Sequence, residues 1–216
     1  MRLYNDSRQQ WLEERKKGIG GSDASSILGL NPYKTNIELW EEKTNRRKEL
    51  DISDNINVKY GVDSEPYLRK LFELDFPCYT VKHKNFNIIK HKEYDFLLAS
   101  LDGELIEKST KRKGILEIKT TTIKNATQSE KWNNKIPMNY YIQVLHYLLV
   151  TGYDFAVVKA QIKTEIEDEV YIKVNHYKIE KRDVTVDIDY LLKKEIEFWQ
   201  HNVLKDIKPN LLLPEL

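Results

Sequence analysis

The spacing of apolar residues changes along the chain and predicts helices at both ends with strands between them. Residues 55–74 carry apolar side chains at about every third or fourth position, which is typical of a helix with one buried face. Residues 96–101 and 115–119 are instead short apolar runs, which are typical of buried strands. The polar segment 108–114 lies between these two runs, so we expect them to be antiparallel neighbours.

Capping and turn residues indicate where the remaining elements begin and end. Gly29 and Gly152 have the conformational freedom that a helix end requires, and Pro137 suits the first turn of a helix. Three N-terminal helices are therefore expected: one from a cap at Asp6 or Ser7 to about residue 17, a short one after caps at Ser22 and Asp23, and one from a cap at Thr35 to residue 40. Two later helices are expected at 137–150 and at about 183–204. Further strands are expected at 79–81, 86–89, 155–158 and 170–174.

This order of elements predicts the fold class. Helices first, strands in the middle and helices afterwards are typical of an α/β or α+β fold, in which helices flank a central mixed, mostly antiparallel sheet. A length of 216 residues fits one domain of this kind. We expect a single domain over 1–216, with a core at about 10–175 and a C-terminal helix at about 183–205.

Composition excludes several classes of protein. The single cysteine, Cys78, excludes an internal disulfide and a cysteine-ligated zinc or iron–sulfur site, because these need several thiolates. The first residues lack the apolar stretch of a signal peptide, and the apolar run 144–150 is too short to span a membrane. We therefore expect a protein of the reducing cytoplasm with no membrane partner.

The charge balance neither demands nor excludes a nucleic-acid partner. The net charge is +1, from 35 Lys and Arg against 34 Asp and Glu, so no general basic field surrounds the protein. A nuclease, however, needs acidic residues for a metal and basic residues for phosphate, and these cancel in the total. Local basic clusters occur at 46–48, 82–84 and 111–113, and solvated loops would explain them equally well.

Asp102 and the triplet Glu117-Ile118-Lys119 carry the most informative chemistry. Side chains alternate between the two faces of a strand, so Glu117 and Lys119 share one face while Ile118 points to the other. Asp102 ends the preceding predicted strand and is expected to approach Glu117. Two neighbouring carboxylates repel each other, and a bound cation relieves that repulsion. Mg²⁺ prefers such oxygen ligands and would polarise the attacking water beside Lys119.

Each of these residues also has a plain structural explanation when it is taken alone. Glu-x-Lys is a common exposed pair on an edge strand. Glu65 would be a solvated residue of its helix. Gln143 lies among apolar residues of another predicted helix, either as a buried amide that needs a partner or as a surface residue.

Their order along the chain resembles that of the PD-(D/E)xK nuclease superfamily. This order is Glu on a helix, Asp at a strand end, Glu-x-Lys on the next strand and Gln on a helix. More specific segments resemble the YqaJ-type viral recombinase family, which is similar to lambda exonuclease. These segments are 11–15, 19–29, 31–33, 99–103, 116–120 and 141–144. The resemblance covers about residues 10–152 and implies a nuclease-like α/β fold.

The resemblance implies a catalytic role for each matching position. Asp102, Glu117 and the carbonyl of Ile118 would hold Mg²⁺, for which Mn²⁺ would substitute. Glu65 would assist with a second metal ion. Lys119 would act on the attacking water, and Gln143 would orient Lys119.

The resemblance also implies a pocket for the 5′-phosphate of DNA. Arg15 and Ser22 match the family's phosphate-binding Arg and Ser, and Ser100 is expected to join them. A guanidinium can grip a terminal phosphate with two hydrogen bonds. The family's further Arg after the Glu-x-Lys strand is missing here, and Lys124 is expected to replace it as a simple point charge.

The function that follows is a Mg²⁺-dependent 5′→3′ exonuclease that acts on ends of double-stranded DNA and leaves 3′ single-stranded tails for recombination. The resemblance implies a homo-oligomer such as a trimeric ring, a single-strand annealing protein as partner, and a phage or prophage protein in the bacterial cytoplasm. Two alternatives stay open: an endonuclease or junction-cleaving enzyme with the same metal site, and a non-catalytic DNA-binding or assembly module.

Overall fold

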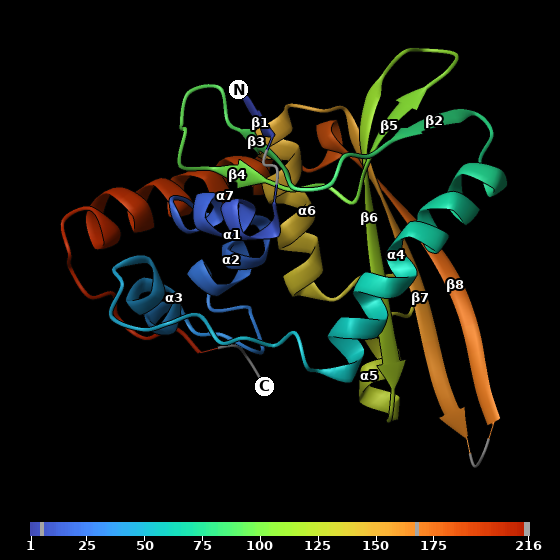
Figure 1. The fold of residues 1–216 in the computed structure, drawn as a ribbon, viewed down its shortest axis with the longest axis horizontal. Helices are drawn as coiled ribbons and strands as arrows, with labels where there is room; N and C mark the ends of the chain where they lie inside the picture. Colours follow the sequence, from blue (N-terminus) through green and yellow to red (C-terminus); the bar gives the residue numbers. More distant parts are fainter. Residues whose placement is uncertain (5–6, 167–168, 214–216) are drawn as a thin grey trace.

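Two β-sheets organise the structure, a computed structural model that describes residues 1–4, 7–166 and 169–213 (Figure 1). The smaller sheet has the order β1–β3–β4, with β1 (Arg2–Tyr4), β3 (Asn87–Lys90) and β4 (Leu98–Ala99). The larger sheet has the order β2–β5–β6–β7–β8, with β2 (Tyr79–Lys82), β5 (Gly103–Glu107), β6 (Lys113–Ile123), β7 (Phe155–Ile166) and β8 (Glu169–Glu180).

The helices are grouped at the two ends of the chain and around the large sheet. They are α1 (Arg8–Lys16), α2 (Gly21–Ile27), α3 (Asn36–Lys43), α4 (Ile56–Asp75), α5 (Ala126–Glu130), α6 (Met138–Thr151) and α7 (Thr185–Glu197), with a 3-10 turn η1 (Lys181–Asp183) before α7 and a π-helical turn η2 (Phe198–Val203) after it. No helix of the described residues is both long enough and apolar enough to cross a membrane.

The large sheet is mixed and mostly antiparallel, which confirms the predicted fold class. Within the described part of this sheet, β6 and β7 are the one parallel pair, and α6 provides the crossover between them. The other neighbours in this sheet, β2–β5, β5–β6 and β7–β8, pair antiparallel. The result is a mixed α/β fold with helices on both faces of the sheet.

Helices α4 and α6 cover opposite faces of the large sheet because successive residues of β6 point to opposite sides. Leu116 and Ile118 pack with Leu68 and Phe72 of α4. Ile115 instead belongs to the cluster that contains the apolar face of α6. Figure 1 shows α1, α2, α3 and α7 gathered on the α6 side, while the β7–β8 hairpin extends away from the body.

The prediction that residues 96–101 and 115–119 form neighbouring strands was wrong. Strand β4 is limited to Leu98–Ala99 and belongs to the small sheet, whereas β5 is the antiparallel neighbour of β6. The apolar run before Ser100 is buried for another reason, since Leu97 bridges to Ile19 beside the N-terminal helices. The short strand β5 was not predicted because Glu104 and Glu107 interrupt the apolar pattern on which the strand predictions were based.

Several predicted helix boundaries also differ. Ser7 caps α1 as expected, and the alternative cap Asp6 lies outside the described residues. Helix α2 begins earlier than predicted, because its N-cap is Gly20 and not Ser22 or Asp23. Helix α3 continues to Lys43, and β7 and β8 are each far longer than the short apolar runs that predicted them.

Asp23 has a structural role that its prediction as a cap only partly captured. Its Oδ2 atom accepts the Gly20 N–H at 3.0 Å and also pairs with Lys43 Nζ at 2.8 Å. Burial of Asp23 opposes its ionisation, but the charges of Lys43 and Lys34 outweigh burial and lower its pKa to about 2. This ion pair joins the start of α2 to the end of α3.

The pair should make stability depend on pH in the acidic range. The folded-state pKa of Asp23 is lower than the usual aspartate value of 3.8, so its contribution to stability is fully present above about pH 5 and disappears as the pH falls towards 2. We expect Asp23→Asn to lower the unfolding free energy by about 2 kcal/mol at pH 7, with roughly half of that difference left at pH 3. Urea unfolding of both proteins from pH 7 to 3 measures this, and a difference that does not shrink would contradict the assignment.

Candidate active site

Asp102 lies where β5 begins and where one edge of β6 becomes free. Strand β5 pairs with β6 only from Gly103, opposite Leu116, so the backbone of β6 beyond this point needs other partners. The Asp102 carboxylate accepts the N–H of Ile118 through Oδ2 at 2.7 Å. Arg69 of α4 donates to the Asp102 carbonyl at 2.5 Å. Asp102 therefore approaches Glu117 as expected, but from the start of β5.

Glu117 and Lys119 share one face of β6, as strand alternation predicted. Glu117 Oε1 lies 2.6 Å from Lys119 Nζ. The Glu117 side chain is almost fully buried, with the residue only 1% exposed. Its second oxygen, Oε2, is buried and has no hydrogen-bond partner among the residues that the structure describes. A buried carboxylate with an unsatisfied oxygen is costly unless something else binds there.

Burial and mutual repulsion shape the ionisation of the two carboxyl groups. Burial raises the pKa of Asp102 well above its usual value, and the charges of Glu117 and Glu65 raise it further. Burial also raises the pKa of Glu117, against the opposing charge of Lys119. Additional positive charge at this site, such as a bound cation, would therefore stabilise the ionised form of both carboxyl groups.

Lys119 is held by contacts on several sides. Its Nζ atom donates to Gln143 Oε1 at 3.0 Å and lies 4.7 Å from the centre of the Tyr140 ring. Burial opposes the charged ammonium, but Glu117 and Asp102 outweigh burial and raise the pKa of Lys119. Lys119 therefore carries a proton in this arrangement.

Gln143 belongs to a chain of hydrogen bonds that the sequence analysis only partly identified. Its Oε1 accepts from Lys119, and its Nε2 donates to the hydroxyl of Tyr147 at 3.0 Å. Tyr140 and Tyr147 were not predicted as site residues. Their spacing around Gln143 on one helix was the available signal, because residues three and four apart lie on the same helical face.

Glu65 lies close enough to influence the site electrostatically, but it is engaged elsewhere. Its Oε1 pairs with Arg69 Nη1 at 2.7 Å. Its charge still raises the pKa of Asp102 and of Glu117. Among the residues that the structure describes, no group of three or more His, Cys, Asp or Glu side chains is positioned to hold a metal. A metal-binding role for Glu65 therefore stays a prediction.

The residues nevertheless fit a hard cation. The buried Glu117 carboxylate, whose Oε2 has no hydrogen-bond partner among the described residues, and the half-buried Asp102 carboxyl, whose pKa is raised, are two groups that a divalent ion would stabilise. Ile118 lies between Glu117 and Lys119, with its N–H bound to Asp102. The predicted role of its carbonyl as a ligand stays a prediction.

Three of the four predicted phosphate-binding residues are joined in the structure. Arg15 donates to Ser22 Oγ at 3.4 Å, and its guanidinium lies 4.5 Å from the centre of the Trp11 ring. Trp11 Nε1 donates to Ser100 Oγ at 2.9 Å, and Ser100 donates to the carbonyl of Asn87. Trp11 is half-buried and connects Arg15 with Ser100.

Lys124 lies apart from this group. It follows Ile123 at the end of β6 and is exposed, and its backbone N–H donates to Gln128. It lies five residue steps along the chain from Lys119, which corresponds to about 16 Å in an extended strand. Its proposed contact with the same phosphate is therefore not visible in the geometry.

His146 is a further buried residue that the sequence analysis did not assign. Its Nδ1 lies 2.7 Å from Glu195 of α7, and its Nε2 lies 2.9 Å from the carbonyl of Leu98 in β4. His146 follows Gln143 by nearly one turn of α6. It thus fixes the helix that carries Gln143 against the strand that leads to Asp102.

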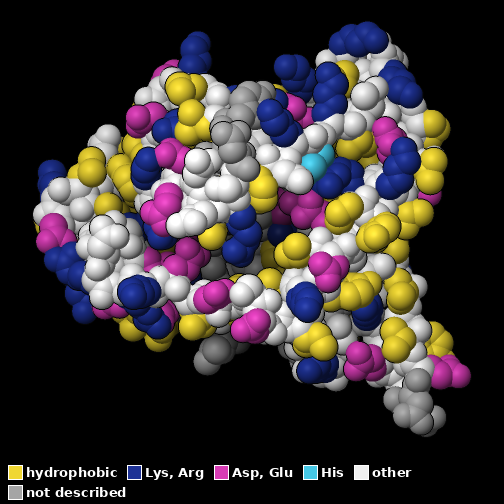
Figure 2. Space-filling view, in the orientation of Figure 1, with side chains coloured by type: hydrophobic (Ala, Val, Ile, Leu, Met, Phe, Trp, Pro, Cys, Tyr) yellow, Lys and Arg dark blue, Asp and Glu magenta, His cyan; other side chains and the backbone are white. Residues whose placement is uncertain are grey.

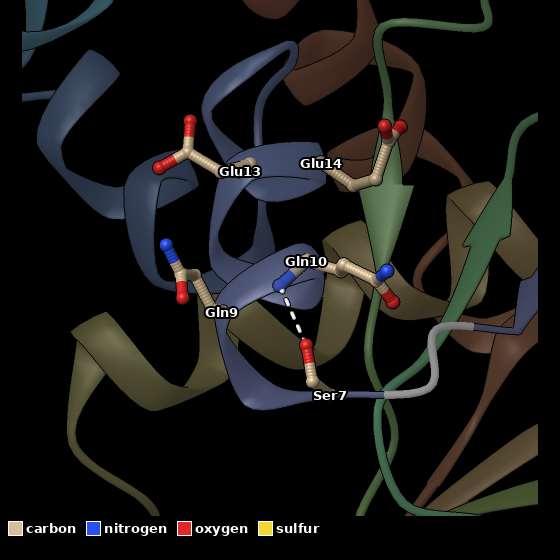
Figure 3. A pocket seen from close by; sticks show the side chains of 5 residues that line it. All are labelled: Ser7, Gln9, Gln10, Glu13 and Glu14. Carbon is tan, nitrogen blue, oxygen red and sulfur yellow. Dashed lines mark hydrogen bonds between the residues drawn. The ribbon is translucent and has the colours of Figure 1, made fainter.

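Two hollows on the surface differ in character. Figure 2 shows the molecule hollowed between the N-terminal helices and α4, with acidic side chains gathered in its depth. A second hollow of about 540 Å³ lies along α1 (Figure 3) and is lined by Ser7, Gln9, Gln10, Glu13 and Glu14. Figure 3 shows these side chains diverging to both sides of α1, and Glu13 and Glu14 pair with neighbouring lysines. The hollow along α1 therefore has no converging polar groups that would form a site.

The fold is shared with solved nuclease structures. The alkaline exonuclease LHK-Exo from Laribacter hongkongensis matches 91% of this chain and 98% of its own, with a TM-score of 0.58 and 16% identity. A phage-related exonuclease from Haemophilus somnus 129PT matches 88% of this chain and 96% of its own, with a TM-score of 0.53 and 12% identity. At these identities the likeness establishes a shared fold, in which helices flank a mixed β-sheet.

Sequence comparison identifies the family. The model of the YqaJ-like viral recombinase domain matches residues 10–154, and the chain belongs to this family. The protein YqaJ of Bacillus subtilis (strain 168) is 38% identical over 205 residues, which cover 95% of this chain and 59% of YqaJ. Protein D345L of African swine fever virus (strain Badajoz 1971 Vero-adapted) is 45% identical over 81 residues. The resemblance stated from the sequence is confirmed, and the chain spans little more than half the length of YqaJ.

Proposed function

We propose that this chain is a Mg²⁺-dependent nuclease that degrades double-stranded DNA from its 5′ ends and leaves 3′ single-stranded tails for recombination. The observation that carries the proposal is the buried Glu117 carboxylate, which has one unpartnered oxygen and lies beside Asp102 and the ammonium of Lys119. Membership of a viral recombinase family and the fold of known exonucleases support the same reading.

The proposed mechanism assigns a separate task to each residue. Asp102 and Glu117 would hold Mg²⁺, with Glu65, the Ile118 carbonyl and a second ion as further elements of the proposal, and Mn²⁺ would substitute. When bound, the metal supplies positive charge to the scissile phosphate and polarises the attacking water. Lys119, fixed by Gln143, would orient that water and stabilise negative charge on the phosphate in the transition state.

The proposed substrate end is recognised beside Trp11. Arg15, Ser22 and Ser100 would bind the terminal 5′-phosphate, because a guanidinium and two hydroxyls supply several donors to one anion. The proposal includes a homo-oligomer such as a trimeric ring, a single-strand annealing partner, and action in the cytoplasm of a cell that carries the phage or prophage. Because this chain covers only 59% of YqaJ, the activity of a whole protein of that length is also a proposal.

One observation favours an endonuclease or junction-cleaving enzyme as the second candidate. The exposed Lys124 makes no side-chain contact with Arg15, Ser22 or Ser100 among the described residues, so Arg15 is the one cation that joins the other predicted phosphate-binding residues. An end-binding site with one cation is weaker than one with two, and an enzyme that cuts within a strand would need no end-binding site.

Digestion of DNA with Mg²⁺ separates these functions. We expect linear duplex to be degraded faster with 5′-phosphate than with 5′-hydroxyl ends, while closed circular DNA stays intact. The physical reason is that the terminal phosphate adds charge-assisted hydrogen bonds only at an end. Cutting of the circle would favour the endonuclease. No cutting of either DNA, with Mg²⁺ or Mn²⁺, would reject both candidates and favour a non-catalytic binding module.

A further inference from the structure

A third hollow, a cleft lined mainly by basic residues, lies beside the start of β5 and Asp102. It has a volume of about 210 Å³, and its lining residues are Arg2, Lys82, His83, Lys84, Asn87, Leu101 and Glu104. Leu101 immediately precedes Asp102, so the cleft borders the proposed metal site. The lining contains three permanent cations and one carboxylate, which gives it an excess of positive charge.

The carboxylate of this cleft is already satisfied by other residues. Glu104 accepts two hydrogen bonds from Arg2, at 3.1 and 2.7 Å, and a further one from the hydroxyl of Tyr153. These contacts, against the effect of burial, lower the pKa of Glu104. Lys82 pairs with Glu104 in the backbone register of β2 and β5, yet no carboxylate of the described residues forms an ion pair with the Lys82 ammonium. The Lys82 ammonium therefore contributes positive charge that no carboxylate of the described residues neutralises.

The loop that carries these lysines is anchored to the phosphate-binding residues. Phe86 has a left-handed backbone, with φ of 58°, and its ring lies 6.3 Å from the ring of Trp11. Trp11 in turn contacts Arg15 and Ser100. At the following position, Asn87 accepts the hydroxyl of Ser100 through its carbonyl. The loop from Lys82 to Asn87 is thus held against the residues that would bind the DNA end.

We propose that Lys82 and Lys84 bind a backbone phosphate of the DNA next to the phosphodiester that is cut. The basic cleft and the Arg15–Ser100 group would then form one continuous phosphate-binding surface on either side of Asp102. This inference rests on the proposed function, because it assumes that DNA enters the hollow at Asp102. Figure 2 shows Lys, Arg and His side chains directly beside the acidic side chains of that hollow. Lysine suits such a position because a flexible point charge can follow a backbone phosphate without reading sequence.

The test compares two pairs of neutralising substitutions in a Glu117→Gln background, so that DNA is bound without being cut. We expect Lys82→Gln with Lys84→Gln to weaken the binding of a short fluorescent duplex roughly tenfold, and to make the dependence of log Kd on log salt shallower by about 1 to 2. The matched control is Lys108→Gln with Lys111→Gln, which removes the same charge from the exposed β5–β6 turn, about 13 Å away at the other end of β5. Lys82→Arg with Lys84→Arg should restore both the affinity and the slope.

Each outcome decides the inference. Equal duplex binding by the Lys82–Lys84 variant and the control would overturn it, as would a lack of recovery in the arginine pair. The nucleotide dAMP tests the other source of phosphate: if the substitutions weaken dAMP binding as much as duplex binding, the cleft holds a released nucleotide and not the DNA backbone. Cleavage by the otherwise unchanged protein is measured in parallel. Cutting without dependence on the lysines rejects this site alone, whereas lysine-dependent binding without any cutting rejects only the proposed nuclease.

Discussion

Replacing Glu117 by Gln is expected to lower the rate of DNA cleavage by at least about a thousandfold. The substitution keeps the shape of the side chain but removes the negative charge between Asp102 and Lys119. A neutral amide would bind Mg²⁺ poorly, and it would also leave Lys119 without its ion-pair partner. Cleavage of linear duplex under single-turnover conditions gives the rate, and calorimetry with Mg²⁺ reports metal binding separately.

The control for this experiment is Glu107→Gln, which changes the same chemical group at the far end of β5 from Asp102. This variant should cut DNA at the normal rate. Circular dichroism and thermal unfolding should show that both variants fold. Normal cleavage by the folded Glu117→Gln protein would reject the active site assigned to β6. Loss of cleavage with unchanged Mg²⁺ affinity would instead place the role of Glu117 in positioning Lys119.

The active-site strand could be predicted because its chemistry follows from local geometry. Alternation along β6 places Glu117 and Lys119 together on one face and buries Ile118 on the other, whatever the rest of the fold does. Gln143 drew attention because an amide flanked by apolar residues can need a buried partner, and its role towards Lys119 came from the family resemblance. Both arguments depend on residues that are close together in the sequence.

The parts that the sequence did not predict depend on distant contacts. Trp11 and Ser100 are 89 positions apart, and His146 and Glu195 are 49 apart. The apolar run before Asp102 has the composition of a central strand, but its burial comes from packing on the N-terminal helices. The apolar composition of a segment indicates that it is buried, but it does not indicate which element covers it. For this reason β4 was predicted in the wrong sheet.

The helices that flank the site meet more closely than their sequences suggest, and glycine makes this contact possible. A Cβ atom on Gly21 would lie 2.5 Å from Cε1 of Tyr147 and 3.0 Å from Cγ of Gln143. Gly20, its neighbour, has room, since a Cβ there would meet Asp23 Oδ2 only at 3.7 Å. The first helical residue of α2 therefore controls the spacing between α2 and the face of α6 that orients Lys119.

We accordingly expect Gly21→Ala to lower the unfolding free energy by about 2 kcal/mol and to slow DNA cleavage, because α6 must move away with Gln143 and Tyr147. Gly20→Ala is the matched control and should cost only about 0.5 to 1 kcal/mol through its N-cap position. Urea unfolding and single-turnover cleavage measure the two effects. In a Tyr147→Leu background the cost of Gly21→Ala should become smaller, since the ring that the methyl group meets is gone. Equal unfolding midpoints for Gly21→Ala and Gly20→Ala would show that the two helices do not depend on this contact, and that the orientation of Lys119 is maintained by other means.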